Sequence, residues 1–196
     1  MSIFEYIMVL VSIIIGLGIT HILKNIAFLI QHKDIKFYWI HTLWCINIFF
    51  MLVFFWWWQY NYVIIDDWTF GLYLFIIFFA LIYYLLSALL FSNREIKSYK
   101  EHFYTNRKWF FYLLALSIMI DYGDTALKGF EYFLDRSITY HFQVFIFSSM
   151  SIFGAKSKNE RYHAFFAVSN LSYQIFDGFL ICLLYTSDAA DDSLRV

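Results

Sequence analysis

Long apolar segments follow one another along almost the whole chain, and this feature most constrains its fold. A helix needs about 20 residues to cross the roughly 30 Å of hydrocarbon in a bilayer. Segments of suitable length and apolarity lie at residues 4–30, 37–60, 68–91, 108–134, 138–155 and 162–181. In lipid, backbone hydrogen bonds are satisfied only by helices or a closed barrel. The sequence therefore predicts an all-α integral membrane bundle of six transmembrane helices, which forms a single domain over residues 1–181.

The composition agrees with lipid as the solvent of this chain. Apolar residues make up 62% of the sequence and charged residues only 15%, whereas soluble domains contain about 25% charged residues. The formal net charge is −1, so no basic excess indicates nucleic acid as a partner. We expect contact with the lipid bilayer, and either another membrane protein or a second copy of the chain as a candidate partner.

Lysine and arginine are distributed unevenly between the two sides of the predicted bundle. The loops after the first, third and fifth segments hold Lys33, Lys36, Arg94, Lys97, Lys100, Arg107, Lys108, Lys156, Lys158 and Arg161. The loops on the opposite side hold only Arg136. Because positively charged loops remain in the cytoplasm, we expect both termini outside.

The last residues of the chain differ abruptly in character from the segments before them. Cys182 to Asp191 resembles a translated transposase sequencing adapter, so we expect residues 182–196 to be a non-native tail and leave them out of the predicted domain. Cys45 is then the one cysteine of that domain. No disulfide or multi-cysteine metal site can be built from it.

The fourth segment carries charged residues inside a span that is otherwise apolar. Asp121, Asp124, Lys128 and Glu131 fall within about 80° of arc on an ideal helix, so they share one face. An ionised side chain at the bilayer centre costs at least about 2.5–3.5 kcal/mol. This face is therefore expected to contact the bundle interior or water.

A second polar face lies on the last segment and consists of His163, Asn170, Gln174 and Asp177. We predict an outward-facing pocket between the first, fourth and sixth helices, with Asp124 and Asp177 as ion or proton sites and Lys128 as counter-ion. The residues predicted to line this ligand or ion pocket are Glu5, Asp121, Asp124, Lys128, Glu131, Gln174 and Asp177. In the alternative interpretation, Asp124 and Lys128 pair at a spacing of four and only hold helices together.

Small residues recur every fourth position on two segments, where they allow backbones to approach closely. They are Ser12, Gly16 and Thr20 on the first segment and Asp121, Thr125 and Gly129 on the fourth. These seams predict that the first and fourth helices are central.

A polar cluster is expected at the cytoplasmic side, formed by His21, His41, Glu160, Arg161 and His163. Three histidines at one depth could bind a metal or titrate near neutral pH. Their spacing matches no metal motif, so we expect no metal or other cofactor; the alternative is that each ring binds backbone or lipid headgroups. The sequence also lacks a glycine-rich phosphate loop, a nucleophile elbow and a metalloprotease motif, which argues against a soluble-type active site.

Two short stretches resemble a family of uncharacterised bacterial multi-spanning membrane proteins. The first is Phe4-Glu5-Tyr6 followed by Gly16-Leu17-Gly18 and Thr20-His21, and the second is residues 159–163, Asn-Glu-Arg-Tyr-His. The resemblance implies a location in a bacterial inner membrane. We expect transport of a small ion or solute through the polar pocket, or a role as a subunit of a membrane complex. An intramembrane metal- or haem-binding enzyme or redox protein that uses the histidines is the alternative.

Overall fold

The computed structural model describes residues 2–32, 35–65, 67–91 and 97–193, and from residue 179 onward it describes only the backbone path. Within these ranges the chain is all-helical and has no strand, as predicted. The long helices are α1 (Ile3–Gln31), α2 (Trp39–Trp58), α3 (Phe70–Leu89), α4 (Tyr99–Leu127), α6 (Ile138–Lys156) and α7 (Glu160–Ser193). A 3₁₀ helix, η1 (Gln59–Ile64), extends α2, and a short helix, α5 (Phe130–Leu134), follows α4.

Four helices within the described residues are long and apolar enough to cross a membrane. They are α1, α2 together with η1 (Trp39–Ile64), α3 and α4. Their 18-residue windows combine high hydropathy with at most two charged residues. These properties are those of a membrane protein.

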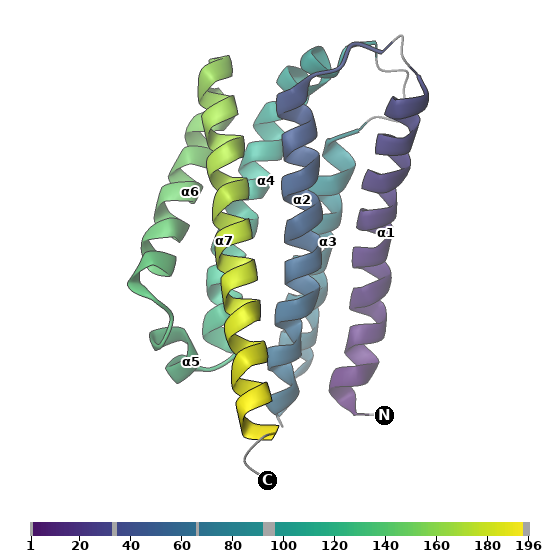
Figure 1. Cartoon of the computed structure of the whole chain (residues 1–196). Coiled ribbons are helices and arrows are strands. Elements are labelled where there is room, and N and C mark those ends of the chain that lie inside the picture. The colour runs from purple at the N-terminus through teal and green to yellow at the C-terminus, as the bar shows by residue number, and fades with distance from the viewer. Residues whose placement is uncertain (1, 33–34, 66, 92–96, 194–196) are drawn as a thin grey trace.

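The long helices lie side by side in one bundle (Figure 1). Helix α1 packs against α3 and α2 at one edge, α4 packs against α3 and α6, and α7 packs against α2 and α6. Helix α1 begins and α5 lies at one end of the bundle, which we call the α5 end. We call the opposite end, where α2, α4 and α7 begin, the histidine end, because it contains His41 and His163.

Aromatic side chains form the centre of the bundle. Trp44 of α2 is fully buried, and its ring lies edge-on to Phe110, Phe111 and Phe166, with centroids 5.2 Å away in each case. Edge-on contacts of this kind are the favoured geometry for aromatic pairs. They join α2, α4 and α7 in one packed core, which supports the walls of the site described below.

The small-residue seam of α1 does not face this core, so the predicted central position of α1 is wrong. The buried face of α1 is an apolar stripe of Ile7, Val11, Ile15 and Ile22. Gly18 belongs to that stripe, because a β-carbon there would lie 3.3 Å from Leu52. The stripe recurs at helical spacing and offers more contact area than Ser12, Gly16 and Thr20, of which Gly16 and Thr20 are exposed and Ser12 is only half-buried.

Helix α4 differs from the predicted segment 108–134 at both ends. It begins at Tyr99, where Ser98 accepts a hydrogen bond from the Glu101 amide at 3.4 Å. It ends at Leu127, because the chain turns at Gly129, whose φ of 145° is accessible to few residues other than glycine. Glu131 therefore lies on α5, and the prediction that it shares a face with the α4 residues is wrong.

Helix α7 also exceeds its predicted segment 162–181, since it begins at Glu160 and continues to Ser193. No proline and no glycine follows Gly178 to stop it. The predicted adapter-derived residues thus continue a regular helix, and their side chains lie outside the described part of the chain.

A cavity at the α5 end

A cavity of about 130 Å³ lies between α2, α4, α6 and α7 near the α5 end. Cavities of about 150 Å³ in proteins can hold a molecule of the size of benzene. Four of its lining residues are charged: Asp121, Lys128, Arg136 and Asp177. Uncharged polar residues in the wall are Tyr83, Thr125, Tyr132, Tyr140, Gln143, Asn170, Tyr173 and Gln174. The cavity therefore presents groups of both charges and many hydrogen-bonding atoms to whatever enters it.

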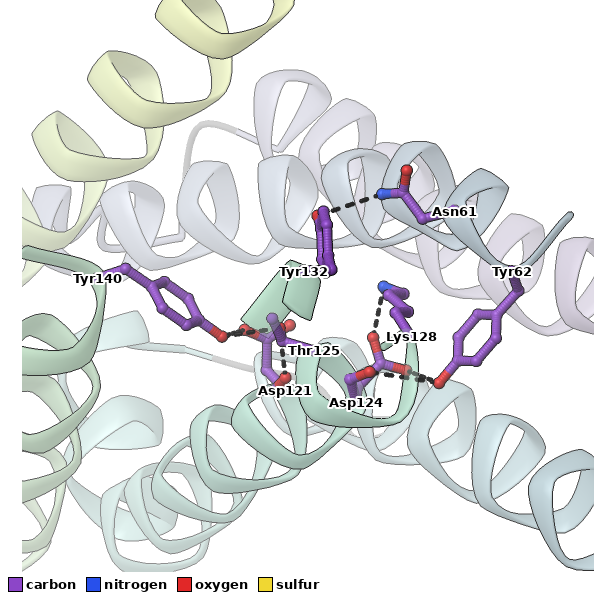
Figure 2. A network of polar contacts seen from close by, with 8 residues as sticks. All are labelled: Asn61, Tyr62, Asp121, Asp124, Thr125, Lys128, Tyr132 and Tyr140. Atoms are coloured by element: carbon purple, nitrogen blue, oxygen red, sulfur yellow. Dashed lines mark hydrogen bonds and ion pairs between the residues drawn. The ribbon is translucent and has the colours of Figure 1, made fainter. Parts of the chain in front are cut away.

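The Lys128 side chain forms a buried ion pair with Asp124, one turn earlier on the chain (Figure 2). The Lys128 Nζ lies 2.5 Å from one Asp124 carboxylate oxygen, and the Tyr62 hydroxyl donates to the other at 2.9 Å. Both charged side chains are at most 5% exposed. The Asp124 carboxylate is thus fully engaged by protein groups, and it does not line the cavity.

The hydroxyl of Tyr140 connects α6 to the last turns of α4 (Figure 2). It lies 2.8 Å from the Thr125 hydroxyl oxygen and 3.5 Å from a carboxylate oxygen of Asp121. Thr125 in turn donates to the backbone carbonyl of Asp121 at 3.0 Å. The Asp121 carboxylate receives only this one long hydrogen bond from described residues, so it remains available to a ligand in the cavity.

Arg136, in the connection between α5 and α6, is surrounded by aromatic rings. Its guanidinium carbon lies 5.2 Å from the Trp58 ring centroid, 5.1 Å from that of Tyr132 and 5.3 Å from that of Tyr140. Such cation–π contacts stabilise a guanidinium without neutralising its charge. Among the described residues no carboxylate forms an ion pair with Arg136, and its Nε is buried without a hydrogen-bond partner.

Two further wall residues on α7 have polar atoms without a partner in the described part of the chain. They are the Nδ2 of Asn170, a residue only 6% exposed, and the Oε1 of Gln174. The amide nitrogen of Gln174 donates to Asn47 at 3.1 Å, and Asn47 donates to the Ala167 carbonyl at 3.0 Å. The α2–α7 contact thus fixes Gln174 while its oxygen stays free. Buried polar atoms are nearly always hydrogen-bonded. Unpartnered atoms also occur elsewhere, for example on Gln59 and His163, but those of Arg136, Asn170 and Gln174 belong to residues that line one cavity, so a ligand there could reach this group of residues.

The structure brings together four residues of the predicted pocket and separates the other three. Asp121, Lys128, Gln174 and Asp177 line the cavity. Asp124 lies behind Lys128, and Glu131 is exposed on α5. Glu5 caps α1. Its carboxylate accepts a hydrogen bond from the Ser2 amide at 2.9 Å, and the Ser2 hydroxyl oxygen accepts one from the Glu5 amide. No residue of α1 lines the cavity, so its position between the first, fourth and sixth helices was predicted wrongly.

Sequence reasoning missed Arg136, which it treated only as a loop cation. Tyr132 and Tyr140 lie four residues before and four residues after it in the sequence, and that spacing could have indicated aromatic neighbours. Trp58 comes from α2, far away in the sequence. Only the packing of α2 beside the α5–α6 connection brings it to Arg136.

At the opposite end, His41 and His163 bind backbone carbonyls, and His21, whose Nε2 is buried without a partner among the described residues, packs against an aromatic ring. His41 lies 2.6 Å from the Leu90 carbonyl through Nε2, and His163 lies 3.0 Å from the Ser157 carbonyl. The Phe91 ring contacts both His21 and His41, with centroids 5.7 and 5.5 Å apart. Among the described residues no group of three or more His, Cys, Asp or Glu is placed to hold a metal ion.

The charged residues near these histidines have partners of their own. Glu160 forms an exposed ion pair with Lys100 at 2.7 Å. The Arg161 side chain is exposed, and its amide donates to Asn159. Arg107 was predicted only as a loop cation and not as a member of this cluster. It is 9% exposed and donates hydrogen bonds to the Ser157 and Tyr104 carbonyls at 3.1 and 2.8 Å. The predicted cytoplasmic cluster therefore consists of separate local contacts.

The comparisons with known proteins give no relative: no family model, curated protein or solved structure matches the chain.

Proposed function

We propose that this chain is a membrane protein of six transmembrane helices that binds a small charged or polar solute in the cavity at the α5 end and moves it across the membrane. One observation carries the proposal: Asp121, Asp177 and Arg136 share one cavity, and no described residue pairs with any of these charges in an ion pair. Charged groups in membrane helices are costly, and they are typical of sites that bind ions or solutes.

The proposed orientation places the α5 end outside and the histidine end in the cytoplasm of a bacterial inner membrane. Four helices already meet the length and hydropathy that a membrane span requires. Helices α6 and α7, of 19 and 34 residues, complete the bundle and are the proposed remaining spans. Nearly all loop lysines and arginines belong to the histidine end, which supports a cytoplasmic location.

The position of the charges near one end supports access from that side. Asp121 and Asp124 occupy the last two turns of α4, and Arg136 follows α5. A solute from the outer side would reach Asp177 through the region enclosed by the α5–α6 connection. The ion pair of Asp124 with Lys128 has a structural role in this proposal, and Asp121 and Asp177 are the ligand-binding carboxylates.

Proteoliposomes test the proposed function. Uptake of ²²Na⁺, of protons and of ¹⁴C-labelled small amino acids is compared between the wild type and Asp177→Asn, with Glu131→Gln as the matched control on exposed α5. We expect uptake of at least one probe that falls at least about tenfold with Asp177→Asn and is unchanged with Glu131→Gln. Equal uptake by wild-type and protein-free liposomes for every probe would reject transport.

A second candidate, assembly with another membrane protein, is favoured by the outer face of α1. A β-carbon added at Gly16 would meet no atom within 4 Å, and both Gly16 and Thr20, one turn further along the same line of the helix, are exposed. Faces of small residues are common at helix–helix contacts in membranes. Cysteine crosslinking at Gly16 in native membranes would give a discrete larger species if α1 contacts a partner, and none if it faces lipid.

A further inference from the structure

We propose that the ligand of the cavity is a small zwitterion, in which one or two carbon atoms separate an ammonium group from an acid anion. This inference rests on the proposed function and specifies its substrate class. It follows from the charges, the unpartnered atoms and the size of the cavity.

Arg136 and Asn170 provide a site for the anionic end. The Arg136 guanidinium is held between three aromatic rings, and no described carboxylate pairs with it. The unpartnered nitrogens of Arg136 and Asn170 are both hydrogen-bond donors on the wall of one cavity. A carboxylate is the natural partner of a guanidinium, because it accepts two parallel hydrogen bonds.

Asp121, Asp177 and the Gln174 oxygen provide a site for the cationic end. The two carboxylates line the cavity, and neither forms an ion pair with a described residue. The unpartnered Oε1 of Gln174 is a further acceptor in the wall. An ammonium group has three donors and no acceptor, so it matches a wall of three acceptors.

The unpartnered donors of the wall favour a molecule with both charges over one with a single charge. Lys128 is neutralised by Asp124, which leaves Arg136 against Asp121 and Asp177, a net charge of −1. A simple cation would balance this charge but would leave the unpartnered nitrogens of Arg136 and Asn170 without an acceptor, and a simple anion would be repelled by the two carboxylates. A zwitterion offers an acceptor to these nitrogens and a cation to the carboxylates at the same time, which offsets the cost of keeping unpartnered groups inside the bundle.

The volume of the cavity limits the ligand to a small molecule. About 130 Å³ is close to the volume of cavities that hold a benzene molecule, about 150 Å³, and accommodates glycine or a similarly small amino acid. Three of the aromatic rings in the wall are occupied by Arg136. The ethanolamine-phosphate headgroup of a lipid has the same pair of charges, so the experiment must distinguish a soluble molecule from a lipid.

Glycine binding to the full chain in phosphatidylcholine nanodiscs tests the proposal. Binding of ¹⁴C-glycine is measured for the wild type, Arg136→Gln and Asp177→Asn, with Glu131→Gln as control. We expect saturable binding that each of the first two variants weakens by at least about tenfold, and that Glu131→Gln leaves unchanged. Melting temperatures of all variants establish that each is folded.

Competition on the wild type keeps the test decisive if a variant fails to fold. Methylammonium and acetate each carry one of the two charges, so we expect both to compete with glycine far more weakly than unlabelled glycine does. If phosphatidylethanolamine in the nanodisc displaces glycine, the zwitterion is a lipid headgroup; if it does not, the zwitterion is a soluble molecule.

The outcomes separate this inference from the proposed function. If glycine fails to bind while methylammonium or Na⁺ stabilises the protein against heat in an Asp177-dependent way, the zwitterion is wrong and the solute cavity remains. If none of these probes binds or stabilises the protein, both proposals fail.

Discussion

Two arginines at opposite ends of the bundle have very different surroundings. At the histidine end, Arg107 is 9% exposed and donates to two backbone carbonyls, those of Ser157 and Tyr104. At the α5 end, Arg136 contacts three ring faces and forms no ion pair with a described residue, and its Nε has no hydrogen-bond partner among them. Arg107 thus joins α4 to the end of α6, whereas the Nε–H of Arg136 remains able to donate a hydrogen bond to a ligand.

The other polar residues differ less sharply between the two ends. His41 and His163 bind carbonyl groups of the protein, but the Nδ1 of His163 and the Nε2 of His21 are buried without a partner among the described residues, as are atoms of Asn170 and Gln174. Polar groups inside a bundle stabilise it when they are paired and reduce its stability when they are not. Asn170 and Gln174 line a cavity together with Arg136, Asp121 and Asp177, so we regard the α5 end as the binding end and the histidine end, with the bonded Arg107, as the stabilising end.

The largest expected effect concerns the buried ion pair between Lys128 and Asp124 at the α5 end. Lys128→Met leaves the Asp124 carboxylate buried beside Tyr62 without a cation, and we expect a loss of about 3–5 kcal/mol in unfolding free energy. Denaturant unfolding in detergent measures this loss. The double variant Lys128→Met/Asp124→Leu removes both charges and should recover most of it. A stable single variant would show that this pair is not structural.

A direct test of the comparison replaces each arginine by methionine. Arg107→Met leaves the Ser157 and Tyr104 carbonyls without their charged donor, so we expect a loss of about 1.5–3 kcal/mol. Arg136→Met removes three cation–π contacts and the attraction of the guanidinium for Asp121 and Asp177, but no ion pair or hydrogen bond with a described residue, so we expect a smaller loss of about 0.5–1 kcal/mol. Both values come from the same unfolding measurement. Equal losses, or a larger loss for Arg136→Met, would contradict the division between a stabilising and a binding end.

The corner between α4 and α5 is sensitive to a β-carbon. Gly129 has a φ of 145°, so Gly129→Ala should cost about 1–3 kcal/mol through backbone strain and shift Arg136 relative to the cavity. Gly123→Ala is the matched control, because this helical glycine has no atom within 4 Å of a β-carbon position. That change should stabilise the protein by about 0.5–1 kcal/mol. Both values are measured by thermal unfolding.

The smallest effect is expected at the surface of the histidine end. The ion pair between Lys100 and Glu160 is exposed, with side chains 52% and 46% accessible, and such pairs are screened by water and salt. Glu160→Gln should therefore leave the melting temperature unchanged within error at physiological ionic strength. A clear decrease would mean that this end depends on surface charge as well as on buried hydrogen bonds.

Much of the helical order could be predicted from the chain because it depends on neighbours in sequence. Apolar runs long enough to cross a bilayer must satisfy their own backbone hydrogen bonds, and a helix does so locally. The pairing of Asp124 with Lys128 is likewise local, since the residues lie four apart along the chain. The end of α4 was misplaced because the turn at Gly129 was interpreted as part of a small-residue seam and not as a break in the helix.

The sequence by itself determined that the chain is helical and suited to lipid. It also identified Asp121, Gln174 and Asp177 as polar residues whose transfer into a membrane costs free energy. Tertiary structure alone decided which charges are neutralised and which line the cavity. Asp124 and Asp121 are the same residue type one turn apart, yet Tyr62 from η1 binds the first, while the second lines a cavity with Arg136 and Asp177. The physical reason is that hydrogen-bond partners and cavity walls come from helices far apart in the chain, so burial and pairing are set by packing.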